Sequence, residues 1–139
     1  MDSKIWGPHY WFTLHTIATT YPDHPNETIK KKYYNLFSDL PLFLPNKSMG
    51  NKFIKLLDKY PISPYLSDKL SLMKWIHFIH NKINEQTGKK TIDFKTSLEH
   101  YHQHYRPKIE KKDASMLKKK HCFHLAVLVM LFSLIKYNT

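Results

Sequence analysis

The feature that most limits the fold of this chain is the way proline and glycine divide it into five stretches with helical periodicity. Within each stretch, apolar residues recur three or four positions apart, as on one face of a helix. A β-sandwich would instead place turn residues at about every 8–12 positions. The spacing therefore predicts an all-α chain, a four-helix bundle with a short fifth helix. The breaks lie at Tyr21-Pro22, Pro41 and Pro45, Pro61 and Pro64, and Gly88.

Residues that favour helix starts and stops give approximate bounds for these helices. Gly7-Pro8 opens the first, because proline is well placed at a first helical position. Asn26 and Ser67 are expected to cap the second and fourth, and Gly88 is the natural end of the fourth. The expected helices span about 7–20, 27–40, 47–60, 68–87 and 93–105.

The character of the sequence changes after Arg106-Pro107. Residues 1–105 carry 14 basic and 9 acidic side chains, whereas residues 106–120 carry 7 and 2. Much of the formal net charge of +11 therefore lies C-terminal to the expected helices, and we expect no nucleic-acid partner. The sequence predicts a helical domain at 1–105, a basic linker at 106–121 and a hydrophobic tail at 122–139.

Two interpretations of the tail remain open. The linker is either a solvated tether or a polybasic segment preceding a C-terminal membrane anchor. The apolar run at 122–135 is shorter than the roughly 20 residues expected of a membrane span, although Lys136 and Asn138 can reach lipid headgroups. Lysines on the near side of an anchor would keep the domain facing the cytoplasm. Without an anchor, we expect a soluble cytoplasmic protein.

Two long motifs, on the first and fourth expected helices, carry a family resemblance. The first reads Trp6-Gly7-Pro8-His9-Tyr10-Trp11-Phe12-Thr13-Leu14-His15, followed by Ala18 and Tyr21-Pro22. The second reads Trp75, then His80-Asn81-Lys82-Ile83-Asn84, then Gly88-Lys89, and Tyr60-Pro61-Ile62-Ser63-Pro64-Tyr65 lies between them. Over residues 5–105 the chain resembles the Erv/ALR flavin sulfhydryl oxidases, and its size resembles the small members found in large DNA viruses.

The residues of these motifs suit a flavin pocket. Each of the pairs Trp11/His15 and His80/Asn84 shares a helix face, since its members are four positions apart. Flat rings can stack on a flavin, and Lys89 can neutralise a pyrophosphate. Singly, such residues are more often structural, but together they supply both walls of one pocket. The resemblance implies FAD as the cofactor, with contacts from Gly7, Tyr10, Trp11, His15, His80, Asn81, Ile83, Asn84 and Lys89.

One part of the family pattern is missing. The family's third helix begins with Cys-x-x-Cys, and Asn46 and Met49 occupy these two positions here. An amide cannot act as the attacking thiolate, and a thioether cannot form a disulfide. The single cysteine, Cys122, can at most form a mixed disulfide with another chain. The sequence therefore contains no intact catalytic residue of the family type.

Two functions follow from the resemblance. The chain is either a thiol oxidase that passes electrons from a thiol-containing protein through FAD to oxygen, impaired or dependent on cysteines from a partner, or a non-catalytic flavin-binding partner of an active paralogue. The resemblance also implies dimerisation, with a second copy or with such a paralogue. We expect no metal, because His100 and His104 lie one turn apart but no Cys, Asp or Glu completes a ligand set.

Overall fold

The computed structural model describes residues 1–106 and, beyond them, Lys119, His121, Phe123, His124 and Met130. The chain divides into two compact units, Met1–His104 and Tyr105–Thr139, and the bundle and its pocket belong to the first. The basic linker and apolar tail expected at 106–121 and 122–139 lie almost wholly outside the described residues. Within the described part, no helix combines the length and the apolar character that crossing a membrane requires.

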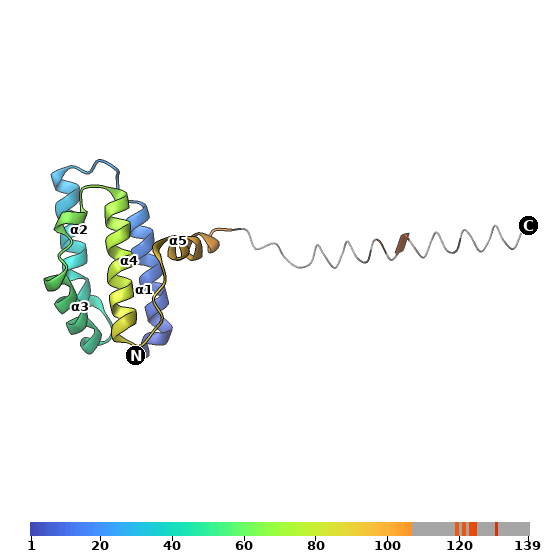
Figure 1. Ribbon diagram of the computed structural model, residues 1–139, viewed down its shortest axis with the longest axis horizontal. Coiled ribbons are helices and arrows are strands. Elements are labelled where there is room, and N and C mark those ends of the chain that lie inside the picture. Colours follow the sequence, from blue (N-terminus) through green and yellow to red (C-terminus); the bar gives the residue numbers. More distant parts are fainter. Residues whose placement is uncertain (107–118, 120, 122, 125–129, 131–139) are drawn as a thin grey trace, which may run out of the picture. The chain divides into compact units, whose positions relative to one another are not determined.

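The first unit is all-helical, as the sequence predicts, and four long helices form its bundle (Figure 1). The chain runs up α1 and back down α4, so the start of α1 and the end of α4 lie at the same end of the bundle, and α5 packs across the side of this pair. The elements are α1 (Ser3–Thr19), α2 (Glu27–Asp39), η1 (Leu40–Phe43), α3 (Lys47–Lys59), η2 (Ser63–Tyr65), α4 (Lys69–Gln86) and α5 (Phe94–Gln103).

The start of α1 corrects the prediction. The helix begins at Ser3, ahead of the predicted start at Gly7, because Asp2 Oδ1 accepts a hydrogen bond from Lys4 N at 2.8 Å. This side-chain cap satisfies one of the free N–H groups of the first turn. Pro8 consequently lies inside the helix rather than at its first position.

The start of α4 differs from the prediction by one residue. Asp68 caps this helix instead of Ser67. Asp68 Oδ1 accepts from Ser71 N at 2.8 Å and Asp68 Oδ2 accepts from Ser71 Oγ at 2.7 Å, so each carboxylate oxygen takes one of the two hydrogen bonds. Asn26 caps α2 as predicted, accepting from Ile29 N at 2.9 Å.

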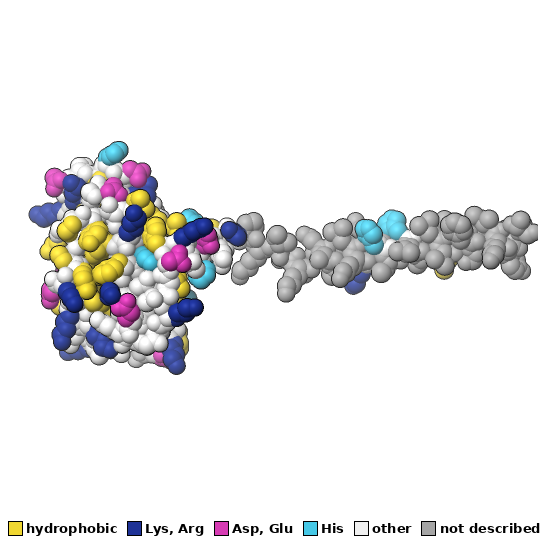
Figure 2. All heavy atoms as spheres, viewed as in Figure 1, with side chains coloured by type: hydrophobic (Ala, Val, Ile, Leu, Met, Phe, Trp, Pro, Cys, Tyr) yellow, Lys and Arg dark blue, Asp and Glu magenta, His cyan; other side chains and the backbone are white. Residues whose placement is uncertain are grey.

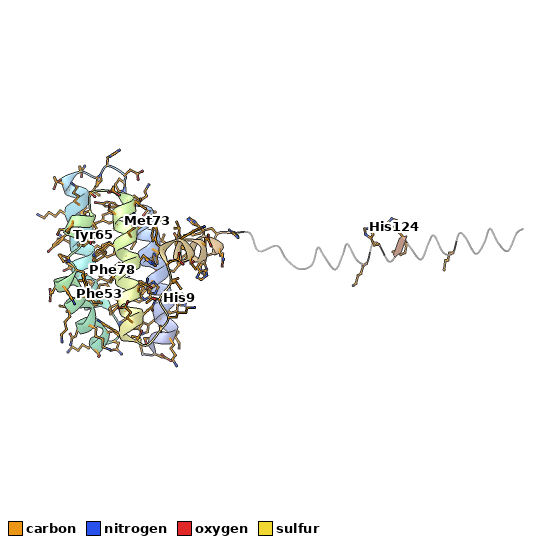
Figure 3. All side chains as sticks on the ribbon, in the orientation of Figure 1. His9, Phe53, Tyr65, Met73, Phe78 and His124 are labelled. Atoms are coloured by element: carbon orange, nitrogen blue, oxygen red, sulfur yellow. The ribbon has the colours of Figure 1, made fainter. Side chains whose placement is uncertain are left out.

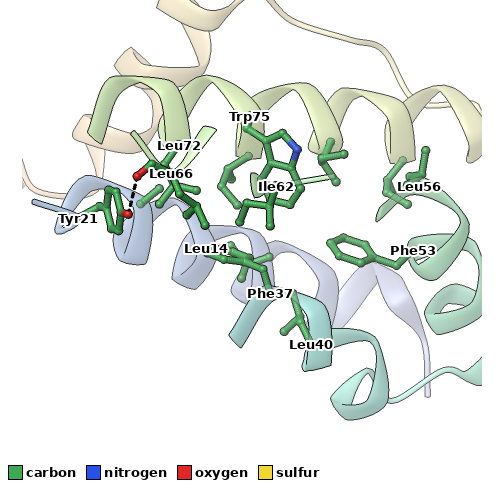
Figure 4. Packing of buried hydrophobic residues seen from close by; sticks show 14 residues of the cluster. Leu14, Tyr21, Phe37, Leu40, Phe53, Leu56, Ile62, Leu66, Leu72 and Trp75 are labelled. Carbon is green, nitrogen blue, oxygen red and sulfur yellow. Dashed lines mark hydrogen bonds between the residues drawn. The ribbon is translucent and has the colours of Figure 1, made fainter. Parts of the chain in front are cut away.

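The core combines aliphatic side chains with aromatic ones, and its Trp and Tyr donate hydrogen bonds to backbone carbonyls (Figure 4). Trp75 on α4 is 1% exposed, donates from Nε1 to the carbonyl oxygen of Tyr60 at 3.1 Å, and packs edge-on against Phe37. Tyr21 is fully buried and donates its hydroxyl to the carbonyl oxygen of Leu66 at 2.9 Å. The rings of Trp75 and Tyr21 are therefore buried without leaving an unpaired donor.

Some apolar side chains remain at the surface. Leu36 on α2 is 44% exposed, whereas the neighbouring Phe37 is fully buried and takes the core-facing position. Figure 2 shows an apolar area between lysines over α3 and α4. The exposed residues include Tyr65 and Phe78, labelled in Figure 3, and Lys82 Nζ lies 5.5 Å above the Phe78 ring. Lysine side chains thus cover part of this apolar surface.

Candidate functional site

A pocket of about 500 Å³ opens between α1, α4 and α5, and the start of α3 contributes to its wall. Its size is typical of small-molecule and cofactor sites. Eight of the nine contacts expected from the sequence line it, although α1 and α4 are far apart in the chain. These eight residues are Gly7, Tyr10, Trp11, His15, His80, Ile83, Asn84 and Lys89.

The rings of Trp11 and His80, both in the lining of this pocket, stack face to face on each other. Their ring centroids are 4.0 Å apart and their planes differ by 10°. His15 also lines the pocket, and its Nε2 lies 3.4 Å from His80 Nδ1. Burial, followed by the proximity of His15, lowers the pKa of His80 to about 3, and burial followed by the proximity of His77 lowers the pKa of His15 to about 4. Both imidazoles are therefore neutral at pH 7, and one donates to the other.

Tyr10 and Trp6 form the adjoining part of the wall. The Tyr10 hydroxyl donates to the carbonyl oxygen of Phe43 at 3.0 Å, which ties α1 to η1. The Trp6 ring packs edge-on against Tyr10, with centroids 5.3 Å apart. The Trp6 Nε1 atom is buried and has no hydrogen-bond partner within the described part of the chain. The pocket thus combines apolar ring surfaces with a donor left unsatisfied beside it.

The two positions at which the resemblance places cysteines both lie at the start of α3. Asn46 caps the helix, and its Oδ1 accepts from Ser48 N at 2.9 Å and from Met49 N at 3.2 Å. Met49 lines the pocket together with Leu44 and Phe53. One position therefore holds a helix cap and the other an apolar wall residue.

Asn81, the ninth expected contact, is not among the residues that line the pocket. Its Nδ2 donates to the carbonyl oxygen of Ile92 at 2.8 Å and lies 3.1 Å from His77 Nε2. His80 and Asn81 are consecutive on α4 and so point about 100° apart around the helix, which has 3.6 residues per turn. The ring of His80 meets α1, whereas the amide of Asn81 meets the segment before α5.

The contribution of α5 to the pocket was not predicted. Tyr101 is 9% exposed, and its hydroxyl lies 3.1 Å from Thr16 Oγ1 and 3.3 Å from Thr19 Oγ1, which holds α5 against α1. The apolar spacing of residues 94–105 indicates a buried face, but periodicity does not say which helix that face meets. The lining residues from α5 are Ser97, His100 and Tyr101, and His104, which caps the end of the helix, also lines the pocket.

Metal binding has no support in the described residues. Among them, no three His, Cys, Asp or Glu side chains are grouped in a way that could hold an ion. His104 instead packs edge-on against Phe12, with ring centroids 5.1 Å apart. The pocket offers aromatic rings, hydrogen-bonding side chains and the positive charge of lysine.

The sequence and the fold are both similar to those of known proteins. The model of the Erv1/Alr family matches residues 8–117. A probable FAD-linked sulfhydryl oxidase of Acanthamoeba polyphaga mimivirus is 33% identical over 109 residues, which cover 78% of this chain and 76% of the relative. A putative FAD-linked sulfhydryl oxidase of Invertebrate iridescent virus 6 is 31% identical over 97 residues, covering 66% of this chain and 87% of the relative.

Solved structures share the fold at lower identity. The yeast Erv1 core superposes with a TM-score of 0.65 at 20% identity, covering 79% of this chain and 88% of that chain. The FAD-binding domain of Erv1 from Saccharomyces cerevisiae has a TM-score of 0.65 at 22% identity, covering 74% of this chain and 92% of that chain. Together with the family match over most of its length, these findings establish that the chain belongs to the Erv1/Alr family.

Proposed function

We propose that this chain binds FAD in the pocket between α1, α4 and α5. The observation that carries the proposal is the stacked pair of Trp11 and His80, with the Asn84 amide and the Lys89 ammonium in the same pocket. FAD joins a flat ring system to hydroxyl groups and a diphosphate, so it needs these three kinds of partner. The names of the viral relatives, which describe them as FAD-linked, further support the proposal.

Each side chain has a distinct part in this binding. The stacked Trp11–His80 pair offers an aromatic surface to the flat ring system and excludes water from it. The Asn84 amide offers both a donor and an acceptor to polar ring edges or hydroxyls. Lys89 attracts the diphosphate charge, and the neutral His15–His80 pair adds no charge beside the ring. Bound FAD would supply a two-electron acceptor at this position.

We further propose that the chain does not oxidise thiols through its own side chains. The resemblance places the family's two cysteines at positions 46 and 49, where this chain has an asparagine that caps α3 and a methionine that lines the pocket. Its one cysteine is Cys122, beyond the family match. A thiol that reduces the flavin must then come from another molecule, and a paralogue that pairs with this chain is the partner that the proposal favours.

Cofactor titration tests the first proposal. We expect the purified protein to bind FAD saturably and to show a flavin absorbance spectrum. Trp11→Ala should weaken binding by about tenfold or more, because a stacking contact of about 1 kcal/mol or more is lost with its apolar area. Tyr34→Ala, an exposed residue on α2, is the matched control and should leave the affinity unchanged. Protein that shows no flavin absorbance after incubation with excess FAD and removal of the free cofactor would refute the proposal.

Oxygen consumption tests the second proposal. With dithiothreitol as electron donor, the FAD-loaded wild type should consume oxygen no faster than free FAD at the same concentration. The double variant Asn46→Cys, Met49→Cys should raise that rate, because it places a dithiol at the edge of the pocket. The variant Asn46→Ser, Met49→Ala changes the same positions without adding sulfur and should not. Rapid uptake by the wild type would contradict the proposed inactivity.

A further inference from the structure

The side-chain amide of Asn81 is satisfied almost entirely within the protein. Its two N–H groups face the carbonyl oxygen of Ile92 at 2.8 Å and His77 Nε2 at 3.1 Å, and its Oδ1 accepts from Ile92 N at 3.4 Å. An amide nitrogen has only two hydrogens to donate. Neither hydrogen therefore remains for a ligand, and the amide pairs with both backbone groups of one residue.

The His77 ring is neutral, as it must be to accept a hydrogen bond from Asn81. Burial lowers the pKa of His77, an effect that the charge of Asp93 and a backbone hydrogen bond with Ile92 only partly oppose, so its ring is neutral at pH 7. A neutral imidazole presents one unprotonated nitrogen, and Nε2 can accept from Asn81. The same ring packs edge-on against Phe94 at the start of α5, with centroids 5.5 Å apart. His77 and Asn81, one turn apart on α4, thus hold both the end of the connecting segment and the first residue of α5.

The other end of this connecting segment, 87–93, is fastened by the backbone. Gly88 has a φ of +68°, in the left-handed region that favours glycine, and it directs the chain away from α4. Lys89 N then donates to the carbonyl oxygen of Asn84 at 2.8 Å, the bond that closes a Schellman motif. The segment is therefore held at Lys89 by the helix end and at Ile92 by the Asn81 side chain. Both Lys89 and Ile92 line the pocket.

We propose that Asn81 is a positioning residue that holds the pocket wall formed by segment 87–93 and does not itself contact the cofactor. The inference rests on FAD as the ligand of the pocket. Asn81 fixes Ile92 through paired backbone hydrogen bonds, which keeps Lys89 and the start of α5 close to α4. The part of FAD that depends on Asn81 is then the diphosphate, through Lys89, and not the ring that stacks on Trp11.

Hydrogen exchange of the cofactor-free protein tests the fastening directly. In Asn81→Ala, the Ile92 amide should exchange about tenfold faster or more, because losing one hydrogen bond raises the population of the open, exchanging state by roughly tenfold. Amides in the middle of α4 should be unaffected. Asn84→Ala, which removes a pocket-lining amide on the same helix, is the matched control and should leave exchange at Ile92 unchanged. Unchanged exchange in Asn81→Ala would overturn the proposal.

A double-mutant cycle tests how Asn81 acts on binding. We expect Asn81→Ala to weaken FAD binding by about tenfold in the wild type but by only about twofold in a Lys89→Ala background, because residues that act through one another are not additive. Combined with Trp11→Phe, Asn81→Ala should retain its full effect. Loss of affinity that is additive with Lys89→Ala, or no loss at all, would overturn the proposal.

Two further outcomes keep the proposals distinguishable. If Asn81→Ala does not fold, as judged by circular dichroism, Asn81→Ser removes the same amide with a smaller change in polarity and takes its place in both experiments. If the wild type binds no FAD but exchange at Ile92 responds as expected, the proposed function fails while the structural role of Asn81 stands. If FAD binds and exchange does not respond, only the role of Asn81 fails.

Discussion

His15 Nε2 lies 3.4 Å from His80 Nδ1, and this contact joins α1 to α4 in the wall of the pocket. A hydrogen bond between two imidazoles requires that at least one ring be unprotonated. Both rings are largely shielded from water and have pKa values well below that of free histidine. The contact therefore links the protonation of the pocket to the packing of the two helices.

The first prediction concerns the stability of the cofactor-free protein at acidic pH. The pKa falls from 6.5 in the unfolded chain to about 4 for His15 and about 3 for His80 in the fold, so the unfolded state binds more protons below pH 6.5. Stability should be fully present above pH 6.5 and should decline as the pH falls towards 4, by on the order of 1 kcal/mol per pH unit for each group. Urea unfolding at several pH values measures this slope.

A variant separates the histidine pair from other acid effects. His15→Asn, His80→Asn removes both groups, and its unfolding free energy should depend less steeply on pH between 6.5 and 4. The matched control is His9→Asn, which changes an exposed histidine on the same helix as His15 and should retain the wild-type slope. A slope that survives loss of the pair would show that other groups control the acid response.

The second prediction concerns the cap of α3. Asn46→Ala removes the acceptor of two backbone N–H groups and should lower the unfolding free energy by about 1 kcal/mol. Asn46→Asp keeps an oxygen in the same place and should cost much less. Chemical denaturation measures both variants. Equal losses for Ala and Asp would mean that the capping bonds contribute little to stability.

The third prediction compares two glycines. A Cβ added at Gly50 would lie 2.8 Å from the carbonyl oxygen of Pro41, so Gly50→Ala must push α3 away from η1 and should cost about 1–3 kcal/mol. A Cβ at Gly7 meets nothing within 4 Å, so Gly7→Ala should be neutral or stabilising by up to about 1 kcal/mol. Both are measured without cofactor, by thermal or urea unfolding. Similar effects at the two positions would contradict the close approach.

The fourth prediction concerns the buried hydroxyl of Tyr21. Tyr21→Phe removes the donor to the Leu66 carbonyl and leaves that buried oxygen unpaired, which should cost about 1–2 kcal/mol. Tyr34→Phe deletes an exposed hydroxyl on α2 and should change stability by less than about 0.5 kcal/mol. Urea unfolding of the two variants distinguishes a stabilising hydrogen bond from a general effect of losing a hydroxyl.

Several features of the protein could be predicted from the sequence because they depend on neighbours in the chain. Apolar residues three and four apart mark the buried helix faces, and Asn26 and Gly88 mark a helix start and a helix end. The same local rules gave two wrong predictions of helix starts, at Gly7 and Ser67. In each case a nearby aspartate caps the helix instead. Local competition of this kind is decided by hydrogen-bond geometry that composition does not contain.

The tertiary structure decided which side chains meet. Trp11 and His80 could be assigned to one pocket from two motifs, but their stacking depends on the packing of α1 against α4. Long-range contacts set the docking of Tyr101 against α1 and the direction of the Asn81 side chain towards Ile92. The periodicity of the sequence carries no information on such contacts. A helix pattern specifies the face that will be buried, whereas the partner of that face is chosen only when all the helices pack together.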